Sequence, residues 1–186
     1  LKPYDVPFIL KIRKLEELTF HTRCNDRVTE LLVGFSRTKR PDGLYISQNI
    51  KKIGKIWPSI NDINLISKSF TNLKSLSLVS CNCDLTPLKT LKNLTDISVQ
   101  TTTFRFLTNL LTVVGKQLNC LELSDVDHLD LNHVVVNCVS LRCFHLRYSV
   151  PLTTVLYDKN IQSDAAHKIQ IPEFSSVEYL QLKLPC

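Results

Sequence analysis

The sequence predicts an α/β fold in which short parallel strands alternate with helices or turns that carry the chain back. The first observation is the stretch 73–83, which reads Leu-x-x-Leu-x-Leu-x-x-Cys. Within it Leu76 and Leu78 alternate with Ser75 and Ser77, so one face of the strand is apolar and the other polar. The second observation is recurrence, because the last apolar position of the pattern falls at residues 78, 99, 123 and 146, in steps of 21, 24 and 23 residues. The third is a hydrophobic fraction of 44%, which is enough to bury a continuous core.

The first part of the chain contains less regular versions of the same unit. Residues 15–20 are expected to form a strand, and apolar residues at helical spacing predict a helix over residues 28–35. A weaker second strand is expected at residues 44–46. Ser59 is expected to cap a helix over residues 60–70, because its hydroxyl can accept a hydrogen bond from a backbone N–H of the first turn.

The middle of the chain is the most regular part. The return segments between its strands differ in length: residues 87–91 are short enough for a single turn, whereas residues 104–114 carry a longer helical stripe. Asp130 is a candidate N-cap for a fourth helix, which starts at Leu131. Four strands are expected here, at residues 73–78, 94–99, 118–123 and 141–146.

The last interval is longer than the others. A seventh strand is expected at residues 177–182, and the excess residues, 149–172, are expected to form a surface loop, with a helix at 165–168 as the alternative. Arrays of stacked units need terminal caps over their cores, and none is recognisable after the seventh strand. The chain also begins at Leu1 and contains no Met. We therefore expect residues 1–186 to be a single repeat domain that is a fragment of a longer chain.

Two placements of cysteine extend the pattern. Cys81 follows Leu76 and Leu78 in the order Leu-x-Leu-x-x-Cys, and Cys138 precedes Leu141 in the order Cys-x-x-Leu. With these cysteines, residues 15–184 resemble leucine-rich repeats, and in particular the cysteine-containing repeats of F-box proteins. The resemblance implies a horseshoe-shaped solenoid with a parallel sheet on its concave face and helices and turns on its convex face. In that family the horseshoe holds a substrate, and a separate F-box, not recognisable in these residues, joins a Skp1–cullin ubiquitin ligase.

The turn that follows each strand departs from a strict repeat. Three residues after the last apolar anchor the chain carries Asn49, Cys81, Thr102, Val126 and Ser149. All but Val126 can hydrogen-bond to nearby backbone groups, so we expect polar turn roles for them. The irregularity argues against the asparagine-ladder repeats of extracellular receptors and favours an intracellular array.

The net charge and the number of cysteines limit the classes of partner and the cellular location that we expect. The net charge is +6, and basic residues gather early in the chain, at Lys11, Arg13, Lys14, Arg37, Lys39, Arg40, Lys51, Lys52 and Lys55. Because no nucleic-acid-binding motif accompanies them, a solvated face is favoured over a nucleic-acid surface. The seven cysteines, an odd number, indicate reduced thiols and a cytoplasmic or nuclear protein. No apolar run approaches the ~20 residues that span a bilayer, so no membrane is expected as a partner.

No catalytic or cofactor motif is present. The four glycines are scattered, which excludes a phosphate-binding loop, and no dinucleotide, hydrolase or metalloprotease signature occurs. The acidic and histidine-rich segment 125–138 invites a metal site, but its spacing matches no zinc pattern, so turn and capping roles are favoured. Cys81 and Cys83 are not a Cys-x-x-Cys redox pair. We expect neither enzymatic activity nor a cofactor.

The remaining candidate for function is the concave face, where the residues beside the buried leucines point away from the core. These residues run from small and polar in the middle strands to aromatic and basic at the end. Arg and Tyr are the residue types that anchor protein interfaces. We therefore predict a protein-binding scaffold, the substrate-recognition repeats of an F-box ubiquitin-ligase adaptor, with a stand-alone scaffold or a basic nucleic-acid-binding array as the alternatives. The predicted partner-binding residues are Glu122, His145, Arg147, Tyr148, Tyr179 and Gln181.

Overall fold

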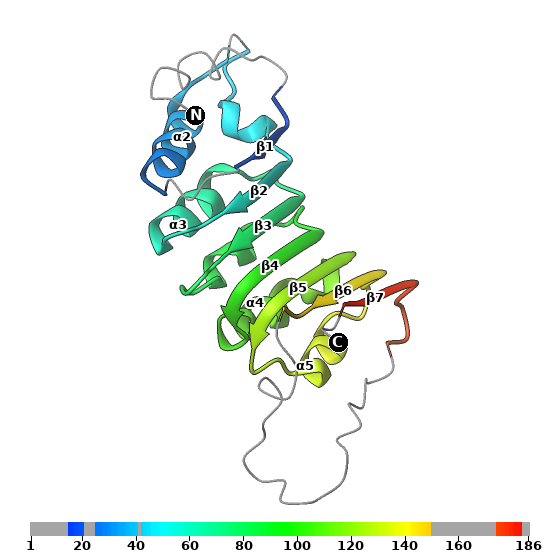
Figure 1. Ribbon diagram of the computed structural model, residues 1–186. Coiled ribbons are helices and arrows are strands. Elements are labelled where there is room, and N and C mark those ends of the chain that lie inside the picture. Colours follow the sequence, from blue (N-terminus) through cyan, green and yellow to red (C-terminus); the bar gives the residue numbers. More distant parts are fainter. Residues whose placement is uncertain (1–14, 21–24, 41, 150–173, 184–186) are drawn as a thin grey trace, which may run out of the picture.

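In the computed structural model the chain forms a parallel sheet whose strands follow one another in chain order (Figure 1). The structure describes residues 15–20, 25–40, 42–149 and 174–183. Within this part the sheet has seven strands, each paired only with the strands before and after it. They are β1 (Glu17–Thr19), β2 (Lys52–Ile56), β3 (Ser75–Val79), β4 (Asp96–Thr103), β5 (Cys120–Asp127), β6 (Cys143–Arg147) and β7 (Tyr179–Lys183). An α/β fold with parallel strands, as the sequence predicts, is confirmed.

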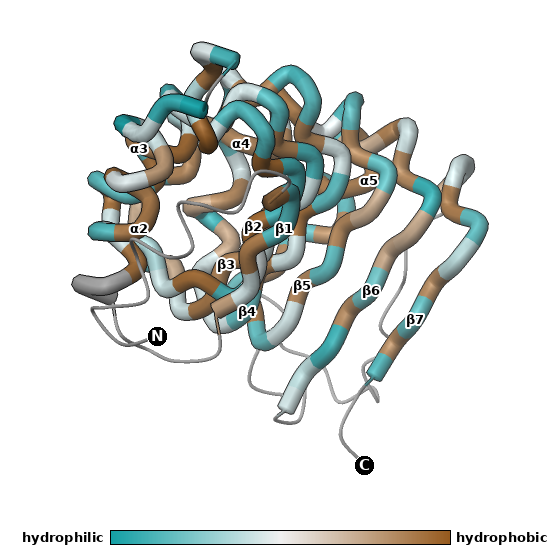
Figure 2. The backbone as a smooth tube through the Cα atoms, turned by 90° about the horizontal axis from the view of Figure 1, so that it is seen from above, coloured by the Kyte–Doolittle hydropathy of each residue, from teal (hydrophilic) through white to brown (hydrophobic). Residues whose placement is uncertain are grey.

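The described helices lie on one side of this sheet, where they carry the chain back between parallel strands (Figure 2). The expected helices over residues 28–35, 60–70 and 104–114 and the helix that starts at Leu131 are confirmed, and the segment 87–91 is a short 3₁₀ turn as predicted. We call the other side of the sheet the open face. The return segments are α2 (Asn25–Arg37), η1 (Ile46–Asn49), α3 (Ile60–Ser69), η2 (Thr86–Thr90), α4 (Arg105–Val114), η3 (Gly115–Gln117) and α5 (Leu131–Asn137).

The second strand lies later in the chain than predicted. Residues 44–46 are not a strand, because Tyr45 makes only an isolated antiparallel bridge with Lys39 and the chain then enters η1. The true strand is β2, in which Ile53 pairs with Leu76 of β3. The signal for it was present in the sequence: Asn49-Ile-x-x-Ile53 repeats the frame of Asn72-Leu-x-x-Leu76.

Two of the helices begin at the predicted caps. Ser59 Oγ accepts a hydrogen bond from Asp62 N at 3.2 Å, and the Asp62 carboxylate accepts one in return from Ser59 N at 2.8 Å. The same carboxylate accepts from Thr29 Oγ1 at 2.7 Å, which joins α3 to α2. In the fourth helix the Asp130 carboxylate accepts from His133 N at 3.0 Å. Short polar side chains therefore set the start of α3 and of α5.

The core lies between the sheet and the helices. Leu76, Ile97, Leu121 and Phe144 stand side by side on successive strands, and each is at most 2% exposed. The four return helices present apolar residues to this row, among them Phe35, Ile66, Leu110 and Val134. Each unit has a thin apolar layer, so burial depends on the neighbouring units rather than on the unit itself.

A residue in the left-handed backbone region ends the regular part of three neighbouring strands. Ser80, Thr101 and Asp125 have φ values of 51°, 54° and 51°, and they follow residues that pair in register across β3, β4 and β5. At each of these positions, the left-handed residue and the residue before it both face away from the core, and the next residue faces inward again. We call these three residues the bulge row. The next residues, Cys81, Thr102 and Val126, are buried, and Thr102 Oγ1 donates to the carbonyl oxygen of Cys81.

Side-chain amides connect the turns that precede the strands. Asn49 Nδ2 donates to Leu15 O at 3.0 Å, Asn72 Nδ2 to Gln48 O at 2.7 Å, and Asn93 Nδ2 to Thr71 O at 3.2 Å. Gln117 Nε2 continues the series with bonds to Leu91 O and Leu94 O at 3.0 and 2.9 Å. We call Asn49, Asn72, Asn93 and Gln117 the amide ladder. Each of its members fastens one turn to the turn of the preceding unit.

Candidate interaction surface

The strand register arranges the side chains of the open face in rows that cross the sheet. The residue before each central anchor forms one row, which contains Ser75, Asp96, Cys120, Cys143 and Tyr179. The residue after the anchor forms a second row, with Ser77, Ser98, Glu122, His145 and Gln181. A third row holds Val79, Gln100, Ser124, Arg147 and Lys183. Small polar side chains on β3 and β4 thus give way to large, charged and aromatic ones on β6 and β7.

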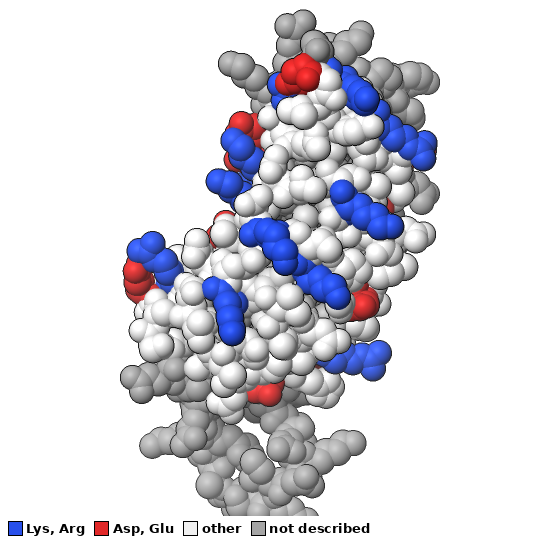
Figure 3. All heavy atoms as spheres, turned by 180° about the vertical axis from the view of Figure 1, so that it is seen from behind, with Lys and Arg blue, Asp and Glu red and all other residues white. Residues whose placement is uncertain are grey.

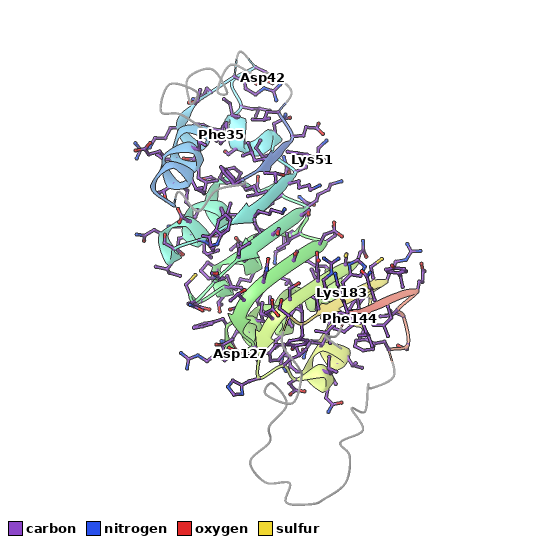
Figure 4. The ribbon with its side chains drawn as sticks, viewed as in Figure 1. Phe35, Asp42, Lys51, Asp127, Phe144 and Lys183 are labelled. Atoms are coloured by element: carbon purple, nitrogen blue, oxygen red, sulfur yellow. The ribbon has the colours of Figure 1, made fainter. Side chains whose placement is uncertain are left out.

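The large side chains at this end contact one another. Arg147 Nη1 lies 3.3 Å from Glu122 Oε1, and the rings of His145 and Tyr179 meet edge to face with their centroids 5.3 Å apart. We call Glu122, His145, Arg147, Tyr179, Gln181 and Lys183 the C-terminal patch. Figure 4 labels Lys183 at this end of the sheet, with Phe144 nearby and Lys51 at the opposite, N-terminal end.

Four members of the patch make few polar contacts within the described chain. Tyr179 is 52% exposed and so open to a further contact, whereas Nε2 of His145 is buried and has no hydrogen-bond partner among the described residues. Arg147 is only loosely paired, because its 3.3 Å contact with Glu122 is made at the solvent-exposed surface. Lys183 takes part in no ion pair among the residues described. The patch therefore holds cationic and aromatic groups whose interactions inside the chain are incomplete.

The structure brings five of the six predicted partner-binding residues together, but the prediction for Tyr148 was wrong. Tyr148 is 5% exposed, and its hydroxyl donates to Val126 O at 2.9 Å. β6 lacks a left-handed residue equivalent to Asp125, so its alternation continues and Tyr148 falls on the same side as Leu146. Burial raises the pKa of the Tyr148 hydroxyl above its ordinary value, with Asp127 and Asp125 adding to the effect.

In the expected strand 177–182, Leu180 takes the same position as Leu76 and Leu121, which predicts a buried anchor, and this prediction was also wrong. Leu180 and Leu182 are 43% and 39% exposed, although they pair with the buried Phe144 and Leu146 of β6. Within the described part of the chain, β7 has a neighbouring strand on one side only. Its core-facing leucines therefore lack the cover that their equivalents on β3 to β6 receive.

Sequence reasoning missed two residues of this surface, Cys120 and Cys143. Alternation along the last strand also predicts that Lys183 faces outward with Gln181, although Lys183 is not among the six predicted partner-binding residues. Cys120 and Cys143 pair in register in the row that ends at Tyr179, at the position that Ser75 and Asp96 occupy on earlier strands. Burial, with smaller contributions from Cys143 and two nearby carboxylates, raises the pKa of the Cys120 thiol to about 11. The Cys120 thiol is therefore protonated at neutral pH and a poor nucleophile.

Three of the six early basic residues that the structure describes form ion pairs. Lys51 Nζ lies 2.8 Å from Glu16, Lys52 Nζ 3.4 Å from Glu17, and Arg40 2.9 Å from Asp42. The predicted cluster at residues 11–14 lies outside the described residues. Basic side chains without an ion pair in the described chain lie instead on the return segments, and Figure 3 shows Lys and Arg outnumbering Asp and Glu on that side. They include Lys68, Lys89, Lys92 and Lys116.

The acidic segment 125–138 forms turns and caps. The Asp125 carboxylate accepts from Ser149 N at 2.6 Å and from Ser149 Oγ at 3.0 Å, and Asp130 caps α5. Across the ranges that the structure describes, no three His, Cys, Asp or Glu side chains are placed to hold a metal ion. None of the described helices has the length and apolar character that a membrane crossing requires.

The expected surface loop at residues 149–172 falls almost wholly outside the described residues. No protein-family model matches this chain, and no curated protein matches its sequence.

Proposed function

We propose that this chain is a leucine-rich-repeat solenoid that binds a protein partner through the C-terminal patch. The observation that carries the proposal is the gathering of Arg147, His145 and Tyr179 on the open face of β6 and β7, beside strands whose open face is small and polar. Arg and Tyr supply most of the binding energy in measured interfaces, where truncating one such anchor costs ~2 kcal/mol or more. The regular recurrence of strand and return segment, joined by the amide ladder, supports the solenoid.

The partner would be a protein rather than a small molecule. The rows of the open face come from neighbouring strands of a continuous sheet, so they offer a broad surface of the kind that a folded partner or an extended peptide covers. The patch carries Arg147 and Lys183 against the single carboxylate of Glu122. It therefore favours a partner that presents acidic groups around an apolar or aromatic side chain that packs on Tyr179.

We further propose that the array belongs to an intracellular F-box adaptor and selects the substrate of a ubiquitin ligase. This finer proposal depends on the cysteine placements at Cys81 and Cys138. Both thiols are buried, and burial raises the pKa of Cys138 to about 12, so Cys138 serves as a small apolar residue of the core. Reduced, buried cysteines at these positions are what the resemblance to F-box repeats leads us to expect.

The test is capture of partners from cells by a tagged full-length chain. Arg147→Ala combined with Tyr179→Ala is expected to reduce recovery of a specific partner at least tenfold, because both side chains are exposed anchors. The matched control is Ser77→Ala with Ser98→Ala, which changes the same face on β3 and β4. Circular dichroism checks that both variants fold. Equal recovery by the two variants would place the binding site elsewhere, and absence of ubiquitin-ligase subunits from the captured complex would remove the F-box proposal while leaving the scaffold.

A second candidate function, binding of a polyanion such as nucleic acid, is favoured by the unpaired lysines of the return segments. Lys68, Lys89 and Lys116 lie near the C-terminal ends of α3, η2 and η3, where they also complement the helix dipoles. Binding to random-sequence RNA or DNA that weakens steeply with added salt would support this function. A lack of binding at low salt would exclude it.

A further inference from the structure

Two thiols lie in contact just after β3. Cys81 Sγ and Cys83 Sγ are 3.5 Å apart, although only Asn82 separates the two residues in the chain. They follow Ser80, the first member of the bulge row, whose left-handed backbone turns the chain so that both side chains point the same way. Cys81 is fully buried, whereas Cys83 is partly exposed to solvent. The pair thus has one buried and one accessible sulfur.

Each cysteine is held by a different neighbouring unit. The backbone carbonyl of Cys81 accepts a hydrogen bond from Thr102 Oγ1 of β4. Cys83 Sγ lies 3.9 Å from the carbonyl oxygen of Pro58, which precedes α3. The contact between the sulfurs is therefore fixed by packing on both sides and does not depend on the short link between the residues alone.

We propose that Cys81 and Cys83 are an oxidation site, at which hydrogen peroxide converts the two thiols to a reversible intramolecular disulfide. In the first step the sulfur of Cys83 attacks the peroxide, the O–O bond breaks, and Cys83 becomes a sulfenic acid while the displaced hydroxide leaves as water with the thiol proton. In the second step Cys81 attacks the Cys83 sulfur, the S–O bond breaks, and a second water leaves with the proton of Cys81. Two thiols are oxidised by two electrons, and one peroxide is reduced to two waters.

Exposure and hydrogen bonding assign the roles of the two sulfurs. Only Cys83 is accessible, so it meets the oxidant first. The contact with Cys83 lowers the pKa of Cys81 and raises that of Cys83, so Cys81 is the better thiolate for the second step. The first step uses the more protonated thiol, and we expect it to be the slower one. A thiol 3.5 Å away should then trap the sulfenic acid before a second peroxide reaches it.

The experiment treats the reduced full-length chain with limiting hydrogen peroxide, blocks the remaining thiols with N-ethylmaleimide, and maps the tryptic peptides by mass spectrometry. Residues 75–89 form a single tryptic peptide that contains both cysteines. We expect this peptide to escape the blocking reagent and to lack two hydrogens at least tenfold more often than the buried Cys138 is oxidised. Fragment ions distinguish Cys138 from Cys120, because both lie in the tryptic peptide of residues 117–142. Sulfinic acid at Cys83 without a disulfide, or oxidation of Cys138 to the same extent, would overturn the proposal.

Variants and a denatured control separate the folded geometry from simple proximity in the chain. Cys81→Ser should leave a sulfenic acid on Cys83 that reacts with dimedone, whereas Cys83→Ser should abolish the oxidation. The same peroxide treatment in urea should reduce the preference for this peptide over that of Cys138 by several fold. An unchanged preference in urea would show that the fold plays no part. A dimedone adduct on Cys81 in Cys83→Ser would contradict the assigned order of steps.

Discussion

Strands β5 and β7 belong to the same sheet but differ in what surrounds them. Leu121 of β5 is fully buried, with β4 and β6 beside it and the helices α4 and α5 on its side of the sheet, whereas Leu180 of β7 is 43% exposed. On the open face the contrast is reversed. The large side chains that contact one another gather on β6 and β7, towards the end of the sheet where the core is less covered. In a stacked array the same leucine position is buried only where units cover it on both sides, and the C-terminal patch lies on β7 and on the two strands before it.

The comparison is tested most directly at the two leucines. Leu121→Ala should lower the free energy of unfolding by about 2–5 kcal/mol, because it leaves a cavity in a closely packed row. Leu180→Ala should lower it by less than about 1 kcal/mol, because the side chain is largely in water already. Urea unfolding followed by circular dichroism measures both values. Equal losses for the two variants would mean that β7 is covered in solution.

Tyr148 provides a second test of the comparison, because it is buried directly after the end of β6. Tyr148→Phe should cost about 1 kcal/mol at neutral pH through loss of the hydrogen bond to Val126 O. The pKa of the tyrosine is raised in the folded protein, so the unfolded chain loses the proton first as the pH rises. In the wild type, the contribution of the neutral hydroxyl to the free energy of unfolding is therefore fully present below pH ~10 and is lost as the pH rises above that value.

The measurement for Tyr148 is a series of urea titrations at increasing pH. The free-energy difference between wild type and Tyr148→Phe should shrink or change sign above pH ~10, since phenylalanine has no proton to lose. A constant difference across this range would mean that the hydroxyl ionises as easily in the folded protein as in the unfolded chain. Tyr179→Phe, at an exposed tyrosine, is the matched control.

The smallest effect is expected in the bulge row. Thr101 has a φ of 54°, a region that disfavours β-branched residues, and its side chain is exposed. Thr101→Gly should therefore raise the free energy of unfolding by up to about 1 kcal/mol. Arg147→Gly, on a strand without a left-handed residue at this place, should instead lower it by about 0.5–1 kcal/mol. Thermal unfolding of both variants shows whether each substitution raises or lowers the stability. A loss of stability at both positions would indicate that the left-handed geometry of Thr101 is not strained.

Most of the fold followed from apolar spacing, since Leu76, Ile97, Leu121 and Phe144 occupy the predicted frame and Ser59 and Asp130 cap their helices. The missed strand β2 was hidden because a left-handed residue, Lys55, separates its anchors Ile53 and Ile56 by three positions rather than two. Backbone conformation of this kind leaves no mark in a pattern of apolar and polar residues when the residue is lysine rather than glycine.

Most residues of the C-terminal patch were also predictable from the sequence. Glu122, His145, Arg147, Tyr179 and Gln181 follow from alternation along the strands, and their meeting follows from the parallel register. The error at Tyr148 has the same origin as the missed strand. β5 contains the left-handed residue Asp125 and β6 has no equivalent, so two consecutive residues face outward on β5, whereas on β6 Arg147 faces outward and Tyr148 inward.

The amide ladder has a consequence for how such a chain changes during evolution. Each of the amides at positions 49, 72, 93 and 117 bonds to backbone carbonyls of the unit immediately before it. Duplication or loss of one whole unit would therefore preserve every remaining rung, because each junction is made by an amide and a carbonyl of the same kind. A lineage could lengthen or shorten the array in single steps and so move the C-terminal patch relative to the first strand without rebuilding either end.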